Sequence, residues 1–172
     1  MRNEEFYNLF VNQLEEMYNA ENQILKALPK MIKLAQSKDL KEALSDHLAE
    51  TEHQVTRIEE IFTLLSITAR DKISKGMEAL LQEGEEIVQN KTKSPALDAA
   101  IICACQKVEH YEIASYGTLR SFAEHLDLAD EVANNFQDTL DEEGALDHVL
   151  TKIADGSVFT SGINEVAAKI KE

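Results

Sequence analysis

The sequence predicts an all-α protein: a bundle of four long helices with a long crossover that contains a short helix, and a short C-terminal helix. Only two prolines and six glycines interrupt 172 residues, so long helices are expected. Apolar residues recur at steps of three and four, the spacing of helices that bury one face. Tryptophan is absent, β-branched runs are short, and 44% of residues are hydrophobic, enough for a sizeable core. A single domain over residues 1–172 is expected.

The first helix is predicted from about Asn3 to Ala35. Pro29 lies inside this range and should kink the helix or loosen a turn. A carboxylate, Glu21, interrupts the apolar stripe. Such a group is costly on a buried line unless it is paired, hydrogen-bonded or bound to a cation. The stripe consists of Phe6, Phe10, Leu14, Met17, Ile24, Leu28, Met31 and Ala35.

The second helix is predicted from about Leu40 to Leu65, after a turn at residues 37–39. Residues three apart share a helix face, so Glu50 and His53 point the same way. They flank the apolar stripe, and we keep them as inward-facing candidates because the sequence leaves the helix phase uncertain by a good part of a turn. The stripe consists of Leu40, Leu44, Leu48 or His47, Thr51, Val55, Ile58, Phe62 and Leu65.

Residues 66–93 are more polar and less regular, and they are predicted to cross between two helical hairpins. A short helix is expected over residues 77–88, with an interruption at Gly84. The acidic side chains in this region, Glu83, Glu85 and Glu86, are expected to face solvent.

The third helix is predicted from Pro95 to about His125, with Ser94 as its N-terminal cap. Its stripe contains a carboxylate, Glu112, and Glu109 precedes that residue by one turn on the same side. The apolar members of the stripe are Ile101, Cys105, Val108, Tyr116 and Leu119.

The fourth helix is predicted from about Ala129 to Ala154, and Gly156 is expected to end it. A last amphipathic helix is predicted from about Ile163 to Ile170. Glu143 and Asp147 lie four residues apart and share one face of the fourth helix. The stripe of that helix consists of Val132, Phe136, Leu140, Glu143, Asp147, Leu150 and Ala154.

Each of the four long helices thus carries a carboxylate at or beside its apolar stripe: Glu21, Glu50, Glu112 and Glu143. Carboxylates that face one interior repel each other and lose hydration, and bound cations remove both penalties. A Glu-x-x-His pair such as Glu50 and His53 is a half-site of dimetal carboxylate bundles. Because the ligands are carboxylate and imidazole without thiolate, the sequence predicts two metal ions, iron or alternatively manganese.

The formal net charge of −15 opposes binding to nucleic acid and to anionic membranes. No apolar run is long enough to span a bilayer, and residues 1–6 contain no apolar signal region. A cytoplasmic protein is therefore expected. Cys103 and Cys105 lie two apart on a helix, so they suit small buried hydrophobic positions better than a disulfide or a metal clip.

Five segments spread over most of the chain carry a resemblance to a known family. They are residues 17–31 (MYNAENQILKALPKM), 47–53 (HLAETEH), 76–80 (GMEAL), 108–119 (VEHYEIASYGTL) and 140–143 (LDEE). With these segments the chain looks like the ferritin-like superfamily. It resembles most closely the YciE/YciF family of bacterial stress proteins, which is related to rubrerythrins.

The resemblance implies a four-helix bundle with extra helices, a homodimer, and a ferritin-type dinuclear site. Glu21, Glu50, His53, Glu112 and Glu143 match the expected ligand positions. This chain departs from the family pattern at one point. A second Glu-x-x-His pair would place a histidine at position 146, where this chain has a leucine.

Two residues are alternatives to that missing histidine. Asp147 is the substitute ligand, and His148 is the alternative, about a quarter-turn away. Glu109 either ligates a metal or supports a ligand from outside.

The leading functional hypothesis is a di-iron oxidase of the ferroxidase type that reacts with dioxygen or peroxide. Tyr18, Tyr111 and Tyr116 are either redox or hydrogen-bonding groups beside the metal or packing aromatics. The alternative is a non-catalytic, stress-induced binding protein whose metal site is structural or vestigial. A third hypothesis is a helical interaction module without metal.

Overall fold

The computed structural model describes residues 3–70, 72–89 and 91–169. Within these ranges the chain forms six helices and one two-stranded antiparallel hairpin. The elements are α1 (Glu4–Leu34), α2 (Lys38–Leu64), α3 (Lys75–Val88), α4 (Pro95–His125), α5 (Asp130–Asp155), β1 (Gly156–Ser157), β2 (Thr160–Ser161) and α6 (Ile163–Ala168).

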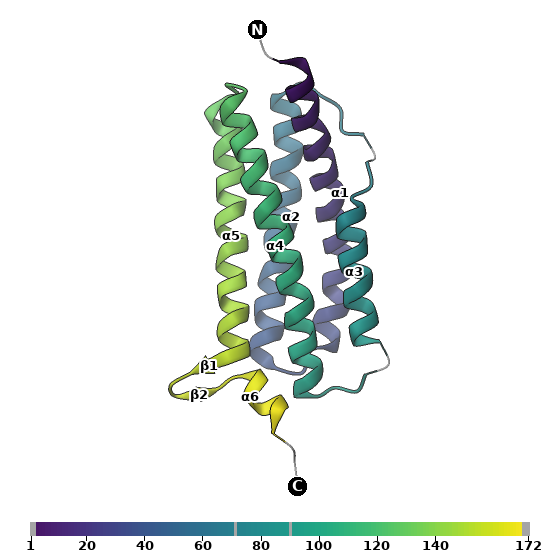
Figure 1. Ribbon diagram of the computed structural model, residues 1–172, viewed down its shortest axis with the longest axis vertical. Helices are drawn as coiled ribbons and strands as arrows, with labels where there is room; N and C mark the ends of the chain where they lie inside the picture. The colour runs from purple at the N-terminus through teal and green to yellow at the C-terminus, as the bar shows by residue number, and fades with distance from the viewer. Residues whose placement is uncertain (1–2, 71, 90, 170–172) are drawn as a thin grey trace.

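The four long helices form an elongated bundle of two helical hairpins, α1–α2 and α4–α5 (Figure 1). Helices α1 and α5 run down the view of Figure 1, whereas α2 and α4 run up. The crossover helix α3 packs against α4 and α1, and α6 packs against α4 and α5. One long crossover is the connectivity of ferritin-like bundles, so the predicted all-α fold class is confirmed.

Capping side chains begin three of the long helices. The Ser94 hydroxyl oxygen accepts a hydrogen bond from the backbone N–H of Leu97 at 3.2 Å. Asn3 and Ser37 cap α1 and α2 in the same way. Helix α5 ends at Asp155 and is followed by Gly156, whose φ of 76° favours glycine. The bounds of α4 are those that the sequence predicts.

The apolar stripes meet in a core that follows the length of the bundle. On α1, every predicted stripe residue from Phe10 to Ala35 is buried, and Glu21 is buried with them. The predicted stripe of α4 is buried as well. Each fully buried Leu, Ile, Val or Phe contributes about 1.5–3 kcal/mol to the free energy of unfolding. This burial holds the four helices, and the polar groups between them, in one register.

Helix α3 is more continuous than the sequence suggests. Helix α3 continues through Gly84, where an interruption was expected, because Gly84 is the point of close packing against α4. A Cβ atom at Gly84 would lie 3.2 Å from the Cβ of Ala104. Pro29 lies within α1, and the helix extends past it to Leu34. Of the predicted C-terminal helix, α6 ends at Ala168, and Ile170 lies outside the described residues.

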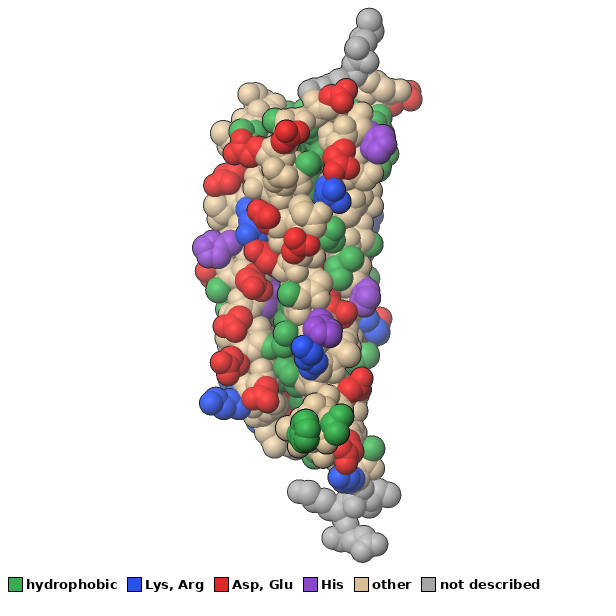
Figure 2. Space-filling model, turned by 90° about the vertical axis from the view of Figure 1, so that its left-hand side faces the viewer, with side chains coloured by type: hydrophobic (Ala, Val, Ile, Leu, Met, Phe, Trp, Pro, Cys, Tyr) green, Lys and Arg blue, Asp and Glu red, His purple; other side chains and the backbone are tan. Residues whose placement is uncertain are grey.

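The outer surface is acidic and broadly polar. On the face shown in Figure 2, acidic side chains are spread along the bundle with basic side chains between them. In the described part of the chain, no helix is long and apolar enough to cross a membrane. Of the two cysteines, Cys105 is buried as expected, whereas the expectation for Cys103 is wrong because it faces solvent.

Candidate metal centre

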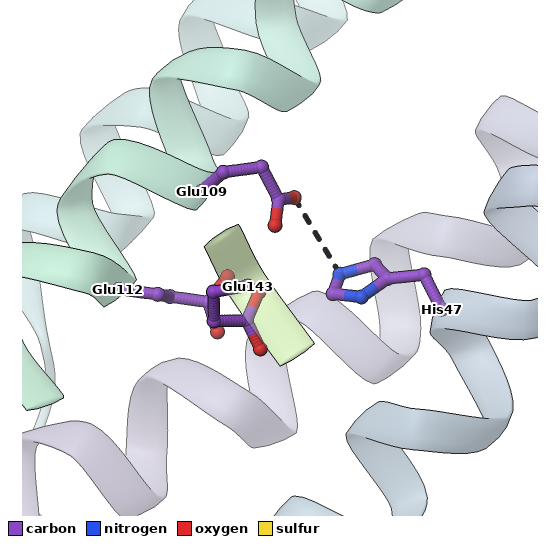
Figure 3. Close-up of side chains that lie close together, drawn as sticks. All are labelled: His47, Glu109, Glu112 and Glu143. Carbon is purple, nitrogen blue, oxygen red and sulfur yellow. Dashed lines mark ion pairs between the residues drawn. The ribbon is translucent and has the colours of Figure 1, made fainter. Parts of the chain in front are cut away.

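A cluster of charged side chains lies in the middle of the bundle interior. It consists of Glu21 from α1, His47 from α2, Glu109 and Glu112 from α4, and Glu143 from α5, and each is at most 2% exposed. Ligand atoms of His47, Glu109, Glu112 and Glu143 all lie within 4.8 Å of one another (Figure 3). We call these five residues the Glu–His cluster.

The helices place these side chains inward through their apolar periodicity. Glu21 takes one position in the buried stripe of α1, and Glu112 takes one in the stripe of α4. Glu109 lies one turn before Glu112, so both carboxylates of α4 project from the same face. The surrounding hydrophobic residues of each stripe fix the helices against their neighbours, and the carboxylates have to follow them into the interior.

The cluster contains more polar atoms than the protein can pair. Among the residues that the structure describes, eight buried side-chain atoms lack a hydrogen-bond partner, and all eight belong to the Glu–His cluster or to its neighbour Gln54. Both carboxylate oxygens of Glu112 and both ring nitrogens of His47 are among them. Each unpaired buried polar group costs roughly 1–3 kcal/mol, more if charged, so protons or bound cations are needed to stabilise this arrangement.

Two neighbouring side chains satisfy part of the cluster. The Tyr116 hydroxyl donates a hydrogen bond to Oε1 of Glu21. The Gln54 amide donates to Oε1 of Glu143 at 2.5 Å and to Glu142 outside the cluster at 3.0 Å. Each of these bonds leaves the second oxygen of the cluster carboxylate without a partner.

The electrostatics of the cluster favour protons or cations. Burial, followed by the charge of Glu143, raises the pKa of Glu21 to about 8. Burial and the neighbouring carboxylates also raise the pKa values of Glu109 and Glu112 well above their usual range. Burial raises the pKa of Glu143 too, against the lowering effect of its hydrogen bonds.

The histidine cannot neutralise these carboxylates. Burial lowers the pKa of His47 to about 4, so its imidazole is neutral at physiological pH. Its Nε2 atom lies 3.6 Å from Oε1 of Glu109. A neutral imidazole next to carboxylate oxygens is a metal-ligand set, because a lone pair is available on one ring nitrogen. The orphaned atoms and the donor types therefore fit divalent metal ions.

The structure brings four of the seven sequence-predicted site residues together: Glu21, Glu109, Glu112 and Glu143. The other three lie around the cluster. Glu50 is half-buried, and its pKa is raised by burial and by the charge of Glu142. The inward orientation expected for His53 is wrong, because its side chain is exposed.

The orientation of α2 has a physical reason. Its inward line runs through His47, Thr51 and Gln54 rather than through Glu50 and His53. The Thr51 hydroxyl donates to the carbonyl of His47 at 2.8 Å, and Gln54 pairs with Glu143. These polar side chains can be buried because they find partners, and the shift of one residue turns the helix face by about 100°.

On α5, the inward position after Glu143 is Leu146, which is 6% exposed. Asp147 is half-buried at the edge of the bundle, where it accepts a hydrogen bond from Gln106 at 3.2 Å and lies 3.6 Å from His110. His148 is exposed. Neither alternative to the missing histidine therefore lies in the Glu–His cluster.

The predicted ligand set omits His47, which the structure places in the cluster. The sequence does contain a signal for it, because His47 lies between Leu44 and Thr51 on one of the two alternative stripes of α2. A histidine at a core-facing position, in register with buried residues on both sides, is the feature that identifies it.

Of the three candidate tyrosines, Tyr116 forms a hydrogen bond with the cluster, and the hydroxyls of the other two are bonded elsewhere. Tyr116 is 1% exposed and bonds Glu21. The Tyr111 hydroxyl is paired with Ser74 at 2.9 Å. The Tyr18 hydroxyl donates to Glu59 at 2.8 Å, on the outside of α2.

Comparisons with known proteins agree with this architecture. A family model described as a domain of unknown function, DUF892, matches residues 5–165. The chain is 37% identical to the protein YciF of Escherichia coli K12 over 159 residues, which cover 92% of this chain and 95% of YciF.

Two solved structures are similar over most of their length. The crystal structure of the Escherichia coli stress protein YciF matches with a TM-score of 0.84 and 36% identity, covering 95% of this chain and 98% of that chain. YcfI of Rhodopseudomonas palustris, described as a candidate structural protein, matches with a TM-score of 0.83 and 38% identity, covering 87% and 94%. The chain therefore belongs to the DUF892 family and is a relative of YciF, as the segments that resemble the YciE/YciF family predict.

Proposed function

We propose that this protein is a ferritin-like dimetal carboxylate protein that uses two iron ions to react with dioxygen or peroxide, as part of a stress response. One observation carries the proposal: four buried carboxylates from three helices converge with oxygen atoms that no protein group pairs. The name of the relative YciF, a stress protein, supports the physiological context.

The charge of the cluster supports two ions rather than one. Four ionised carboxylates carry four negative charges, and two divalent cations balance them. The oxygen-rich donor set with one imidazole suits iron or manganese. When two ferrous ions are bound, they supply two electrons, which together with two protons reduce dioxygen to hydrogen peroxide or hydrogen peroxide to two waters.

Within this proposal the residues have separate tasks. Glu112 and Glu143 would hold the ions from the neighbouring helices α4 and α5, and Glu21 and Glu109 would complete the carboxylate set. His47 ligates through one ring nitrogen. Tyr116 orients Glu21 through their hydrogen bond, and it leaves the second oxygen of that carboxylate free for a cation.

The three remaining predicted ligands have a weaker place in the proposal. Glu50 is a peripheral member, since its charge already contributes to the raised pKa of Glu143. His53 and Asp147 could reach the ions only after a rotation of their helices, because one is exposed and the other lies at the bundle edge.

The test is aerobic addition of ferrous iron to metal-free protein, with oxidation followed by absorbance. We expect oxidation faster than in buffer, and we expect Glu112→Ala to abolish the acceleration. Glu124→Ala is the matched control, because Glu124 lies on the same helix with an exposed side chain paired to Arg120. Oxidation no faster than in buffer, or full activity in Glu112→Ala, would remove the oxidase proposal.

A non-catalytic protein with a structural metal is the second candidate. Two observations favour it: the inward leucine at position 146 and the description of the relative YcfI as a candidate structural protein. In that case metal raises the melting temperature without redox turnover. Elemental analysis that finds no metal in purified protein would leave the third hypothesis, a helical interaction module.

Assembly and location are further parts of the proposal. We retain the homodimer, and the exposed apolar side chains of Val158 and Phe159 are a feature that a subunit contact would cover. We also retain the cytoplasmic location, which suits the free thiols of Cys103 and Cys105.

A further inference from the structure

A small apolar pocket lies beside the Glu–His cluster, under the crossover helix. It has a volume of about 30 Å³ and is lined by residues of α1, α2, α3 and α4. Ten of its twelve lining residues are apolar or glycine, and the two others are His47 and Glu109 of the cluster. The pocket thus ends on the groups that we assign to metal binding.

The exposure of the lining residues shows which end of the pocket opens to solvent. Ala27 of α1 and Leu80 and Leu81 of α3 are half-buried, whereas His47 and Glu109 are only 2% and 1% exposed. The pocket therefore opens between α1 and α3 and closes on the cluster.

The lining residues of the pocket determine which molecules can occupy it. Apolar cavities exclude water, which would lose hydrogen bonds there, and they admit small apolar molecules. Ions and strongly hydrated solutes are disfavoured for the same reason. A volume of about 30 Å³ has room for a diatomic molecule or a rare-gas atom.

The polar approach to the cluster lies on another side. Glu50, Glu142 and Arg57 lie between α2 and α5, where Arg57 forms a bidentate ion pair with Glu142 at 2.6 Å. The cluster therefore has an apolar neighbour towards α3 and a charged neighbour towards α2 and α5. The two environments suit different reactants.

We infer that the pocket under α3 is the entry route and waiting site for dioxygen. This inference rests on the proposed function. Hydrogen peroxide is a polar hydrogen-bonding molecule, and the pocket offers it few partners. Gly84 helps to form the pocket because it lets α3 lie close to α4. This close contact forms the pocket wall next to the entrance.

The first experiment does not depend on metal. Crystals of the metal-free protein under xenon pressure should contain xenon between Leu81, Val108 and His47. The Ala27→Phe variant places a ring at the half-buried entrance, where it does not have to be accommodated in the packed core, and it should abolish the xenon site. A crystal without xenon in this pocket would overturn the inference and leave the proposed metal centre intact.

The second experiment connects the pocket to the reaction. Protein loaded with ferrous iron is mixed with dioxygen or, separately, with hydrogen peroxide. We expect Ala27→Phe to slow the dioxygen reaction several-fold, and Leu81→Ala to accelerate it by widening the route. Neither variant should change the peroxide rate. Ala43→Phe is the control, because Ala43 is a half-buried alanine of α2 that does not line the pocket.

The outcomes separate the two proposals. Unchanged dioxygen rates in Ala27→Phe, combined with loss of its xenon site, would show that dioxygen takes another path, and the inference would fail. If the wild-type protein bound xenon but did not react with dioxygen, the proposed oxidase function would fail, and with it the role of the pocket.

Discussion

The molecule contains two kinds of buried carboxylate, and they differ in what surrounds them. Glu15 and Asp98 are each 3% exposed and accept hydrogen bonds from loop backbone. Glu15 accepts from the N–H of Arg70 at 3.0 Å, and Asp98 accepts from Gln36 and Ser37 at 2.7 and 2.9 Å. The carboxylates of the Glu–His cluster are buried as deeply, but most of their oxygens face other acceptors.

The difference separates a structural role from a binding role. Asp98 ties the loop between α1 and α2 to the first turn of α4, so its charge is matched by protein donors. The side chains of the Glu–His cluster are mostly acceptors, and the cluster contains no cationic side chain that could balance its carboxylates at physiological pH, because the pKa of His47 is lowered to about 4. A fold gains nothing from such an arrangement in the absence of a ligand. The comparison can be tested by changing each kind of carboxylate and measuring stability with and without metal.

The largest expected effect is on the pH dependence of the metal-free protein. Glu21 has a pKa of about 8 in the folded state against 4.5 for the ordinary group. As the pH rises between these values, the unfolded chain releases the proton and the folded chain keeps it, so the free energy of unfolding falls. His47, with a pKa lowered to about 4, acts in the opposite direction, but only below about pH 6.5.

The window from pH 6.5 to 8 therefore isolates the carboxyl groups. Each group that stays protonated there should lower the free energy of unfolding by about 2 kcal/mol. Urea denaturation in the presence of a chelator at several pH values measures this. A stability that is flat or rises over the window would mean that the cluster carboxylates are not buried together.

The second effect is stabilisation by metal. Mn²⁺ at a thousandfold excess over its dissociation constant should raise the free energy of unfolding by about 4 kcal/mol, or the melting temperature by roughly 10 °C. The decline with pH should disappear, because the ions replace the protons. Thermal melts with Mn²⁺ and then with a chelator measure both effects. If the melting temperature did not shift with Mn²⁺, or if it shifted equally in Glu112→Ala, the distinction between the two kinds of buried carboxylate would be contradicted.

The third effect distinguishes Glu112 from an ordinary buried acid. Glu112→Gln removes a carboxyl whose pKa is raised well above its usual range by burial and by its neighbours. In the metal-free protein at pH 7.5 the variant should be more stable than the wild type, because glutamine occupies the buried position without having to take up a proton, whereas its stabilisation by Mn²⁺ should be reduced. Chemical denaturation measures both. Glu124→Gln, at an exposed position of the same helix, should change neither, and a loss of stability in Glu112→Gln would contradict the account.

The fourth effect is a loss of stability when Asp98, a buried carboxylate with hydrogen-bond donors, is replaced. Asp98→Ala leaves the N–H groups of Gln36 and Ser37 without their acceptor, so the free energy of unfolding should fall by about 2 kcal/mol. Because Asp98 does not take part in the cluster, the loss should be equal with and without Mn²⁺. Glu42→Ala, at an exposed position of α2, serves as the control. A loss that depended on metal would erase the distinction between the two kinds of carboxylate.

The smallest effect concerns the outer side chains of α2. Glu50→Gln should weaken Mn²⁺ binding only a few-fold, since Glu50 acts on the cluster through charge at its edge. His53→Ala should leave the affinity unchanged, since His53 is exposed. Calorimetric titration measures both. Loss of binding in His53→Ala would show that α2 presents its other face to the ions.

The helices differ in how far their inward faces could be predicted from sequence. On α1 and α4 the stripe is mainly hydrophobic, so a single carboxylate such as Glu21 or Glu112 stands out against it. On α2 the inward line is polar at His47, Thr51 and Gln54, so hydrophobic periodicity does not fix which residues face inward in the middle of this helix. Gln54 is buried against its partners Glu142 and Glu143 on α5, and His47 lies next to Glu109 of α4, so their inward orientation depends on residues that the sequence of α2 alone does not contain.

The fold itself was easier to predict than the site. The caps at Ser94 and Gly156 and the scarcity of helix breakers define the four long helices closely. Continuity at Gly84 was missed because a glycine in a helix can mean either an interruption or a close contact, and the partner Ala104 decides between them. The pocket under α3 depends on the same tertiary contact and has no counterpart in the linear sequence.

Crystals soaked with Mn²⁺ and measured at a wavelength that reveals the metal by its anomalous scattering test the central claim most directly. The account predicts two anomalous peaks within the bundle, bonded to oxygens of Glu21, Glu109, Glu112 and Glu143, with His47 as a nitrogen ligand. Peaks confined to surface carboxylates such as Glu83 and Glu85, or an interior without metal at saturating Mn²⁺, would contradict it.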